Sequence, residues 1–501
     1  GFRKNLYLKR SDTSRKDEST SRLKVNWQLA DNTKIKFLIS QVDLNDPADI
    51  WTIDGSLNTL SDRPGMDSQK TNSYGLKVFH SFDGFELQSY TSSTDTNVIF
   101  SYDADWGNAD SHFPYVYDYF SETLRDRKSF NQEFRAVSDS ADFQKNSFFE
   151  WVIGANYLEL KESNLKKDDG LYGDPSDPYG PYASASASSS KYKSSNFSVF
   201  GNLDYLLSAS LKFSIGLRWE DWEADYSDSL QESFNPTDKM SGGKISLIKN
   251  MTNDTNMYAS LAKGYKQGGF NLGLGLDANA TNKNLAYDPE FLTNYELGIN
   301  TKLLDSRITF NGVLFYSDRE DQQVLISTQT DPSDPNTFSF LTQNAAEGVN
   351  HGLEINMDMD INESLSAFVN LGILKTEIKN WQSRQDLEGR AQAHAPERSY
   401  ALGLNWAPTS HTYLAIDFTG KSSFYYSDSH NNKSKSYVLT NLNLGYVKNN
   451  WNYELWARNI FDEYYSVRGF YFGNEAPNFI DTLYERHGDP RHIGLSIRYD
   501  F

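Results

Sequence analysis

The 501-residue chain contains no cysteine, so disulfide bridges and thiolate chemistry are excluded. It also has no apolar run near the roughly 18 residues that a membrane-spanning helix requires, and its mean hydropathy is −0.64. Basic residues are in deficit, because 48 Lys and Arg stand against 67 Asp and Glu, for a net charge of −19. Since nucleic-acid phosphates are bound by basic surfaces, this balance argues against nucleic acid as a partner.

Motifs that would mark an enzyme or a resident metal are also missing. The eight His show no H-E-x-x-H spacing. Asp43, Asp46 and Asp49 could surround calcium, but they lack the loop of about twelve residues with its central Gly. No Ser, His and Asp set stands out from a Ser- and Asp-rich background. We therefore predict no catalytic residue, no metal site and no cofactor.

The chain does contain many segments in which apolar and polar residues alternate. The clearest is the C-terminus, where Ile493, Leu495, Ile497, Tyr499 and Phe501 alternate with His492, Gly494, Ser496, Arg498 and Asp500. Successive side chains of a strand point to opposite faces, so this strand has one apolar and one polar face. We expect the apolar face to contact lipid. The pattern recurs along nearly the whole chain, for example in 211–220 and 353–361.

The alternation predicts an all-β fold, a large antiparallel transmembrane β-barrel of roughly twenty strands with lipid outside and water inside. Connections alternate in length: short turns such as Asp31-Asn32 and Asp83-Gly84 are separated by long polar loops such as 94–126 and 461–489. That is the layout of outer-membrane barrels, with short periplasmic turns and long extracellular loops. Aromatic residues, 14% of the chain, suit interfacial girdles. A Tyr-rich soluble β protein is the alternative.

Five segments, in order along the chain, resemble the barrel of TonB-dependent outer-membrane receptors of the ferric-siderophore type. They are Lys263–Asn271, Pro289–Gly298, Asn344–Glu354, Asn459–Tyr465 and Gly488–Phe501. The resemblance implies a barrel of 22 strands, of which we expect about 20 in residues 1–501. An N-terminal signal, the TonB-binding motif, the plug and the first strands are not found in the sequence, so we interpret 1–501 as the barrel domain alone.

The resemblance also implies a function and partners. We expect a receptor in the Gram-negative outer membrane that takes up a scarce nutrient with energy from the TonB complex, most plausibly a ferric siderophore. Receptors for cobalamin, a glycan or another solute, a passive channel, and an outer-membrane hydrolase remain alternatives. Outer-membrane lipid and the barrel-assembly machinery are further expected partners, and a monomer is the expected state. Tyr499 and Phe501 would form the C-terminal insertion signal.

Aromatic and Arg residues crowd several of the long loops. An anionic or aromatic chelate could be gripped by such side chains through cation–π contacts and charge-assisted hydrogen bonds. The candidate ligand-binding residues are Tyr115, Tyr117, Arg468, Tyr471 and Arg486. The alternative is that these aromatic residues only pack the loops or form girdles.

Overall fold

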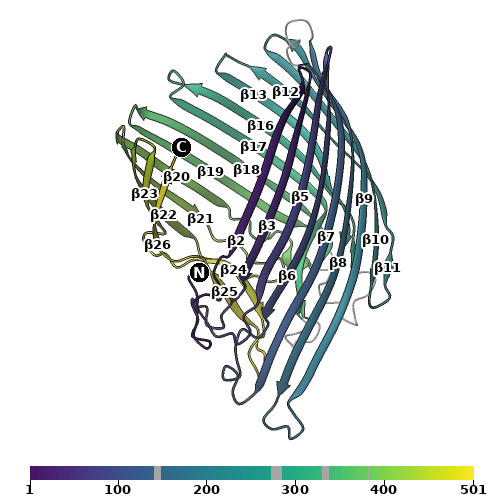
Figure 1. Cartoon of the computed structure of the whole chain (residues 1–501), viewed down its shortest axis with the longest axis vertical. Helices are drawn as coiled ribbons and strands as arrows, with labels where there is room; N and C mark the ends of the chain where they lie inside the picture. Colours follow the sequence, from purple (N-terminus) through teal and green to yellow (C-terminus); the bar gives the residue numbers. More distant parts are fainter. Residues whose placement is uncertain (140–147, 272–284, 330–337, 382–383, 501) are drawn as a thin grey trace.

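The protein is an all-β antiparallel barrel, as the sequence predicts (Figure 1). The computed structural model describes residues 1–139, 148–271, 285–329, 338–381 and 384–500. Within these ranges, twenty strands form the barrel sheet, one of them only two residues long, and the other strands are short pairs. No helix in the described chain is long and apolar enough to cross a membrane.

Most strands of the barrel sheet are long, whereas the elements outside the sheet are short. The barrel strands are β2 (Glu18–Ala30), β3 (Thr33–Pro47), β5 (Met66–Phe82), β6 (Phe85–Asp103), β7 (Val116–Ser138), β8 (Phe149–Gly173), β9 (Tyr182–Ser208), β10 (Leu211–Asp228), β11 (Ser233–Phe234), β12 (Thr237–Asn250), β13 (Thr255–Lys266), β16 (Glu290–Leu303), β17 (Ile308–Gln329), β18 (Phe338–Asn362), β19 (Leu365–Lys379), β20 (Arg398–Thr409), β21 (Thr412–Lys421), β22 (Tyr437–Lys448), β23 (Trp451–Arg458) and β26 (His492–Tyr499). The short elements are β1 (Lys4–Asn5), β4 (Asn58–Thr59), β14 (Gly269–Phe270), β15 (Ala286–Tyr287), β24 (Ser466–Phe472), β25 (Thr482–His487) and the 3-10 helix η2 (Gln385–Leu387).

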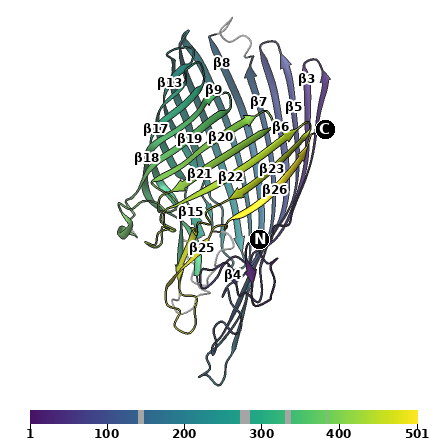
Figure 2. The same ribbon diagram turned by 90° about the vertical axis from the view of Figure 1, so that its left-hand side faces the viewer.

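Connections of two lengths lie at the two ends of the barrel. Tight turns join the strands at one end, such as Asp83-Gly84 between β5 and β6, where Gly84 has a φ of 83° that favours glycine. The opposite end carries the long connections, among them 48–65, 104–115 and 459–491. Figures 1 and 2 show the N-terminus and the β24–β25 pair at this end. We call it the long-loop end.

The barrel wall differs in height around its circumference. Strands β7, β8 and β9 have 23, 25 and 27 residues, whereas β23 and β26 have 8 each. At a rise of about 3.3 Å per residue, the tall strands extend far beyond the span of the short ones. Figure 2 shows both sides of this uneven wall. Strands β23 and β26 are joined by the connection that contains β24 and β25.

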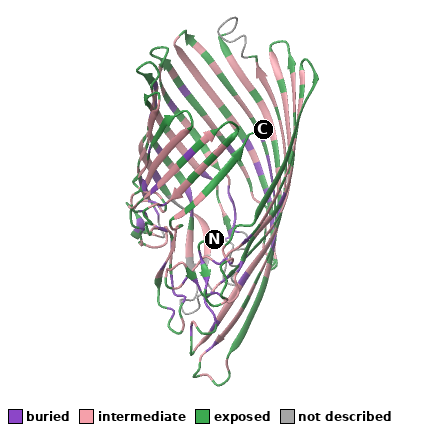
Figure 3. Cartoon of the chain, turned by 60° about the vertical axis from the view of Figure 1, so that its left-hand side comes forward, coloured by how far each residue is buried: buried purple, intermediate pink, exposed green. Residues whose placement is uncertain are grey.

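The outer face of the barrel is apolar, and the last strand shows its register. Leu495, Ile497 and Tyr499 lie opposite Leu455, Tyr453 and Trp451 of β23, so these six side chains share one face. Leu495 is 64% exposed and Ile497 56%, which is the exposure expected of side chains that face lipid. Figure 3 shows such exposed bands alternating along the strands. Phe501 lies outside the described residues, and the insertion signal stays a prediction.

Two strands are paired on one side only. Although the sheet curves into a barrel, the described ladders join β2 to β3 and β26 to β23, and none joins β2 to β26. All thirteen residues of β2 are exposed. Each of these strands therefore keeps one row of backbone groups outside the sheet's hydrogen bonds.

Candidate ligand site at the long-loop end

The β24–β25 hairpin is the element around which the long-loop end is organised. Its two strands pair antiparallel, which places Arg468 opposite Arg486 and Tyr471 opposite Leu483. Three of the five predicted ligand-binding residues, Arg468, Tyr471 and Arg486, are thus held on one two-stranded element. Nothing in the sequence pattern alone shows that positions 468 and 486 are neighbours.

Aromatic rings from two other loops hold the hairpin in place. Trp51 stacks on Phe470 with ring centroids 4.4 Å apart and on Trp106 at 5.2 Å. Trp106 packs edge-on against Phe472 at 5.6 Å and Tyr484 at 5.1 Å. Each such pair contributes about 0.5–1.5 kcal/mol beyond its buried area. Loops 48–65 and 104–115 are therefore fixed to the hairpin by one continuous aromatic cluster.

Contacts from the far side of the sheet show that the hairpin reaches across the mouth of the barrel. Phe470 lies 5.8 Å from Phe340 of β18, between ring centroids. Tyr471 lies 5.7 Å from the ring of His430, which belongs to the connection between β21 and β22. Strand β18 is far along the sheet from β3 and β6, whose loops supply Trp51 and Trp106. The hairpin thus joins loops from well-separated strands.

The two hairpin arginines form a positive site without a carboxylate partner. Within the described residues, neither Arg468 nor Arg486 forms an ion pair. The guanidinium of Arg468 lies 5.0 Å from the ring centroid of Phe470. Burial and the neighbouring Arg486 lower the pKa of Arg468, and burial and Arg486 likewise lower the pKa of Arg3. Arg486 therefore acts on two other cations here, Arg3 and Arg468, in a chain whose net charge is −19.

Of the remaining predicted residues, Tyr117 contacts the segment that connects β24 to β25, and Tyr115 lies two residues before it. Tyr117 is only 1% exposed, and its hydroxyl hydrogen-bonds Asn474 Oδ1 at 3.2 Å. Its ring packs edge-on against Phe479 at 5.3 Å. Tyr115 is half-buried at the end of loop 104–115, where its N–H donates to the His112 carbonyl at 2.9 Å. Tyr471, in contrast, is 40% exposed.

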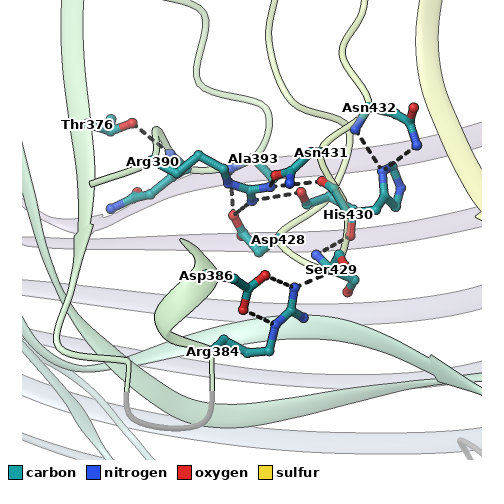
Figure 4. Close-up of polar contacts among 12 residues, drawn as sticks. Thr376, Arg384, Asp386, Arg390, Ala393, Asp428, Ser429, His430, Asn431 and Asn432 are labelled. Atoms are coloured by element: carbon teal, nitrogen blue, oxygen red, sulfur yellow. Dashed lines mark hydrogen bonds and ion pairs between the residues drawn. The ribbon is translucent and has the colours of Figure 1, made fainter. Parts of the chain in front are cut away.

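A second arginine group fixes the neighbouring loops, as Figure 4 shows. Arg390 donates from Nη1 to the His430 carbonyl at 2.8 Å and to Asn431 Oδ1 at 3.0 Å. Its Nη2 donates to the Ser427 carbonyl at 3.0 Å and to Asp428 Oδ1 at 3.1 Å. The guanidinium also lies 4.3 Å from the ring of Tyr425. Arg390 thereby ties its own loop to the loop that carries His430.

Several residues of this site could not be singled out from the sequence. Arg3 and Trp51 lie far along the chain from the hairpin, which Trp51 contacts and whose Arg486 acts on Arg3. Arg390 binds the separate loop that carries His430. The one signal in the sequence was two Trp residues, Trp51 and Trp106, in connections that are otherwise polar. Across the described chain, no group of three or more His, Asp or Glu is arranged to hold a metal ion.

Comparisons with known proteins agree with this architecture. The family model described as TonB dependent receptor-like, beta-barrel matches residues 6–460. The ferric yersiniabactin uptake receptor FyuA from Yersinia pestis superposes with a TM-score of 0.79 at 17% identity, over 100% of this chain and 73% of that one. The siderophore receptor PiuA from Acinetobacter baumannii gives 0.73 at 16%, over 96% and 74%.

A curated relative also matches in sequence. The pesticin receptor of Yersinia pestis is 23% identical over 267 residues, which are 52% of this chain. The matched region spans only 36% of the relative's length.

Proposed function

The chain belongs to the TonB dependent receptor-like β-barrel family, and from this premise we propose that it is the barrel of a receptor for the energy-dependent uptake of a ferric siderophore. Family membership places the chain in the outer membrane. FyuA is described as a ferric yersiniabactin uptake receptor and PiuA as a siderophore receptor, and both have this fold, which supports the choice of substrate. The energy source in this proposal is the TonB complex, and the working unit is a monomer inserted by the barrel-assembly machinery.

The observation that supports the proposal is that the two neighbouring arginines of the hairpin form no ion pair within the described residues. Arg468 and Arg486 face each other at the long-loop end without a carboxylate among the described residues. An acidic protein repels anions through its general field, so local cations are needed where an anionic ligand binds. A ferric chelate with negative charge and aromatic groups would meet two guanidinium groups beside Phe470 and Tyr471.

The five predicted residues take different parts in this proposal. Arg468, Tyr471 and Arg486 contact the ligand directly, and Tyr115 contributes from the neighbouring loop. Tyr117 supports the site from below, because its side chain is buried and its hydroxyl is bonded to Asn474. No step of covalent chemistry is needed, since capture and passage of an intact chelate form and break no bond.

The test is ligand binding by the full-length receptor with both hairpin arginines replaced. Charge-assisted hydrogen bonds contribute about 1.5–3 kcal/mol each, so Arg468→Ala with Arg486→Ala should weaken binding of the cognate ferric siderophore at least about tenfold. Arg384→Ala is the matched control, because Arg384 is already paired with Asp386 at 3.0 Å. Binding would be measured by isothermal titration calorimetry against a panel of ferric siderophores, cobalamin and oligosaccharides.

Two outcomes would contradict the proposal. Unchanged affinity in the double variant would show that the two arginines do not bind the ligand. Tight binding of cobalamin or an oligosaccharide, with no ferric siderophore bound, would show that the proposed substrate class is wrong.

A further inference from the structure

Two carboxyl groups are buried side by side at the foot of loop 104–115. Asp103 is 6% exposed and Asp105 is 1% exposed. Asp105 is well supplied with donors, since its Oδ1 accepts the Tyr119 N–H at 2.9 Å and its Oδ2 the Gly107 N–H at 3.2 Å. Asp103 Oδ1 accepts the Trp106 N–H at 3.1 Å. Asp103 Oδ2, however, is buried with no hydrogen-bond partner, although the carboxyl of Asp105 lies within hydrogen-bonding reach.

The charged groups around this pair do not neutralise it. Asp62 and Asp118 add negative charge nearby. Arg63 is engaged elsewhere, since it binds Asp118 at 2.8 Å and Asp169 at 3.6 Å.

Among the described residues, His112 is the basic side chain that lies against Asp105, and burial favours its neutral form. His112 Nε2 lies 3.8 Å from Asp105 Oδ2, and burial lowers the pKa of this imidazole although Asp105 and Glu475 oppose the effect. The donors near Asp103, the Trp106 N–H and the Ser61 hydroxyl, are both uncharged. A buried carboxylate without a neighbouring cation is strongly disfavoured inside a protein. The simplest way to satisfy both carboxyl groups is one shared proton.

We propose that Asp103 is protonated at neutral pH and donates its O–H to Asp105, and that this proton works as an alkaline-sensitive latch between loop 104–115 and the β24–β25 hairpin. The proposal requires no ligand and stands independently of the proposed function. The geometric basis of the latch is that Asp105 and Trp106, which adjoin Asp103 in the chain, also contact the hairpin and its connecting segment. The Asp105 carbonyl accepts Asn474 Nδ2 at 3.2 Å, and Trp106 packs on Phe472 and Tyr484.

Loss of the proton would set two negative charges against each other in a buried site. Burial and the adjacent Asp105 raise the pKa of Asp103 to about 9, and burial also raises the pKa of Asp105. In an opened, hydrated loop, Asp103 would return to an ordinary value of about 3.9. Between these two values the closed loop holds one proton more than the open loop, so closure weakens as pH rises.

The coupling of loop closure to proton binding predicts how steeply closure depends on pH. With a difference of one bound proton, the ratio of closed to open loop falls about tenfold per pH unit, and it levels off above the pKa of the closed form. Asp103→Asn removes the titrating proton but keeps a donor, because the amide can donate to Asp105 as the carboxylic acid does. The slope should therefore vanish in Asp103→Asn while the loop stays closed.

The experiment is hydrogen exchange followed by mass spectrometry on the full-length protein in detergent, from about pH 6 to about pH 10, with rates corrected for intrinsic exchange. Peptides covering 104–119 and 470–486 report the latch. In the wild type, corrected opening should rise about tenfold per pH unit up to about pH 9. Asp103→Asn should be flat, and Asp110→Asn, an exposed carboxyl of the same loop, should keep the wild-type slope.

Three results would overturn the proposal. One is a flat wild-type profile. Another is an Asp103→Asn loop that is open at pH 7, which would mean that the charge of Asp103 is required. The third is opening of the wild type by EDTA at pH 7 with closure on added Ca²⁺, which would assign the pair to a cation. Infrared spectroscopy of the wild type alone supplies an independent check, since a protonated-carboxyl stretch must be present at pH 7 and lost at high pH.

Discussion

Arg390 and the Arg468–Arg486 pair lie at the same end of the barrel but differ in the hydrogen-bond acceptors and carboxylates around them. The Arg390 side chain is 7% exposed and is surrounded by four oxygen acceptors and an aromatic ring. Arg468 and Arg486 face each other and form no ion pair within the described residues. The protein supplies acceptors for both Nη atoms of the first guanidinium. In our proposal, the other two guanidinium groups bind an external anion.

The two regions are also held together by different forces. The loops around Arg390 are joined mainly by hydrogen bonds. Arg390 donates four of them, and the backbone N–H groups of Ala393 and His394 donate two more. The hairpin is held by stacked rings, with Trp51 and Trp106 at its centre, and its arginines contribute repulsion instead. A charged residue can therefore be structurally essential in one loop and structurally dispensable in the next.

The largest effect is expected for Arg390→Ala. Asp428, whose side chain is 14% exposed, would lose its cation, and removing one partner of a buried pair destabilises by about 3–5 kcal/mol. Hydrogen exchange in peptides covering 384–394 and 422–436 should accelerate more than about a hundredfold. Peptides from β20 and β21 should change little, because the barrel ladders remain. Unchanged exchange in both loops would show that Arg390 is not what joins them.

A smaller effect is expected for Trp106→Phe. The replacement keeps an aromatic ring but shortens its contacts with Trp51, Phe472 and Tyr484, so the hairpin should lose about 1 kcal/mol of local stability. Exchange of residues 466–487 would measure this loss. Trp27→Phe is the control, since Trp27 is 51% exposed on the outer face of β2. Equal effects of the two replacements would argue against a special role for the aromatic cluster.

The sequence predicts the barrel well because apolar and polar residues alternate along many of its strands. The alternation in 493–499 predicts one apolar face of β26, and its pairing with β23 confirms that the apolar residues of the two strands share a face. Tight turns such as Asp83-Gly84 involve only neighbouring residues, so they too can be predicted from the sequence. The mouth is different, because its contacts join residues hundreds of positions apart, such as Tyr117 and Asn474.

Individual roles within the site depend on that long-range packing. Tyr115 and Tyr117 look equivalent in the sequence, yet Tyr115 is half-buried and Tyr117 is 1% exposed and bonded to Asn474. Similarly, nothing local distinguishes Arg390 from Arg468. The difference lies in the carbonyl groups of His430 and Ser427, which reach Arg390 from another loop. Loop packing of this kind has no period that a sequence pattern could reveal.

The smallest effect, and the one of opposite sign, is expected for Arg486→Gln. Glutamine keeps much of the side-chain length but removes the charge that acts on both Arg3 and Arg468. Because Arg468 is exposed and Arg486 is half-buried, solvent screens their repulsion, and the gain in hairpin stability should be at most about 1 kcal/mol. Raising the salt concentration should reduce the difference between variant and wild type, since screening weakens the repulsion in the wild type. Hydrogen exchange of residues 466–487 at low and high salt would measure both effects. If Arg486→Gln destabilises the hairpin, Arg486 has a structural role like that of Arg390, and the proposed repulsion is wrong.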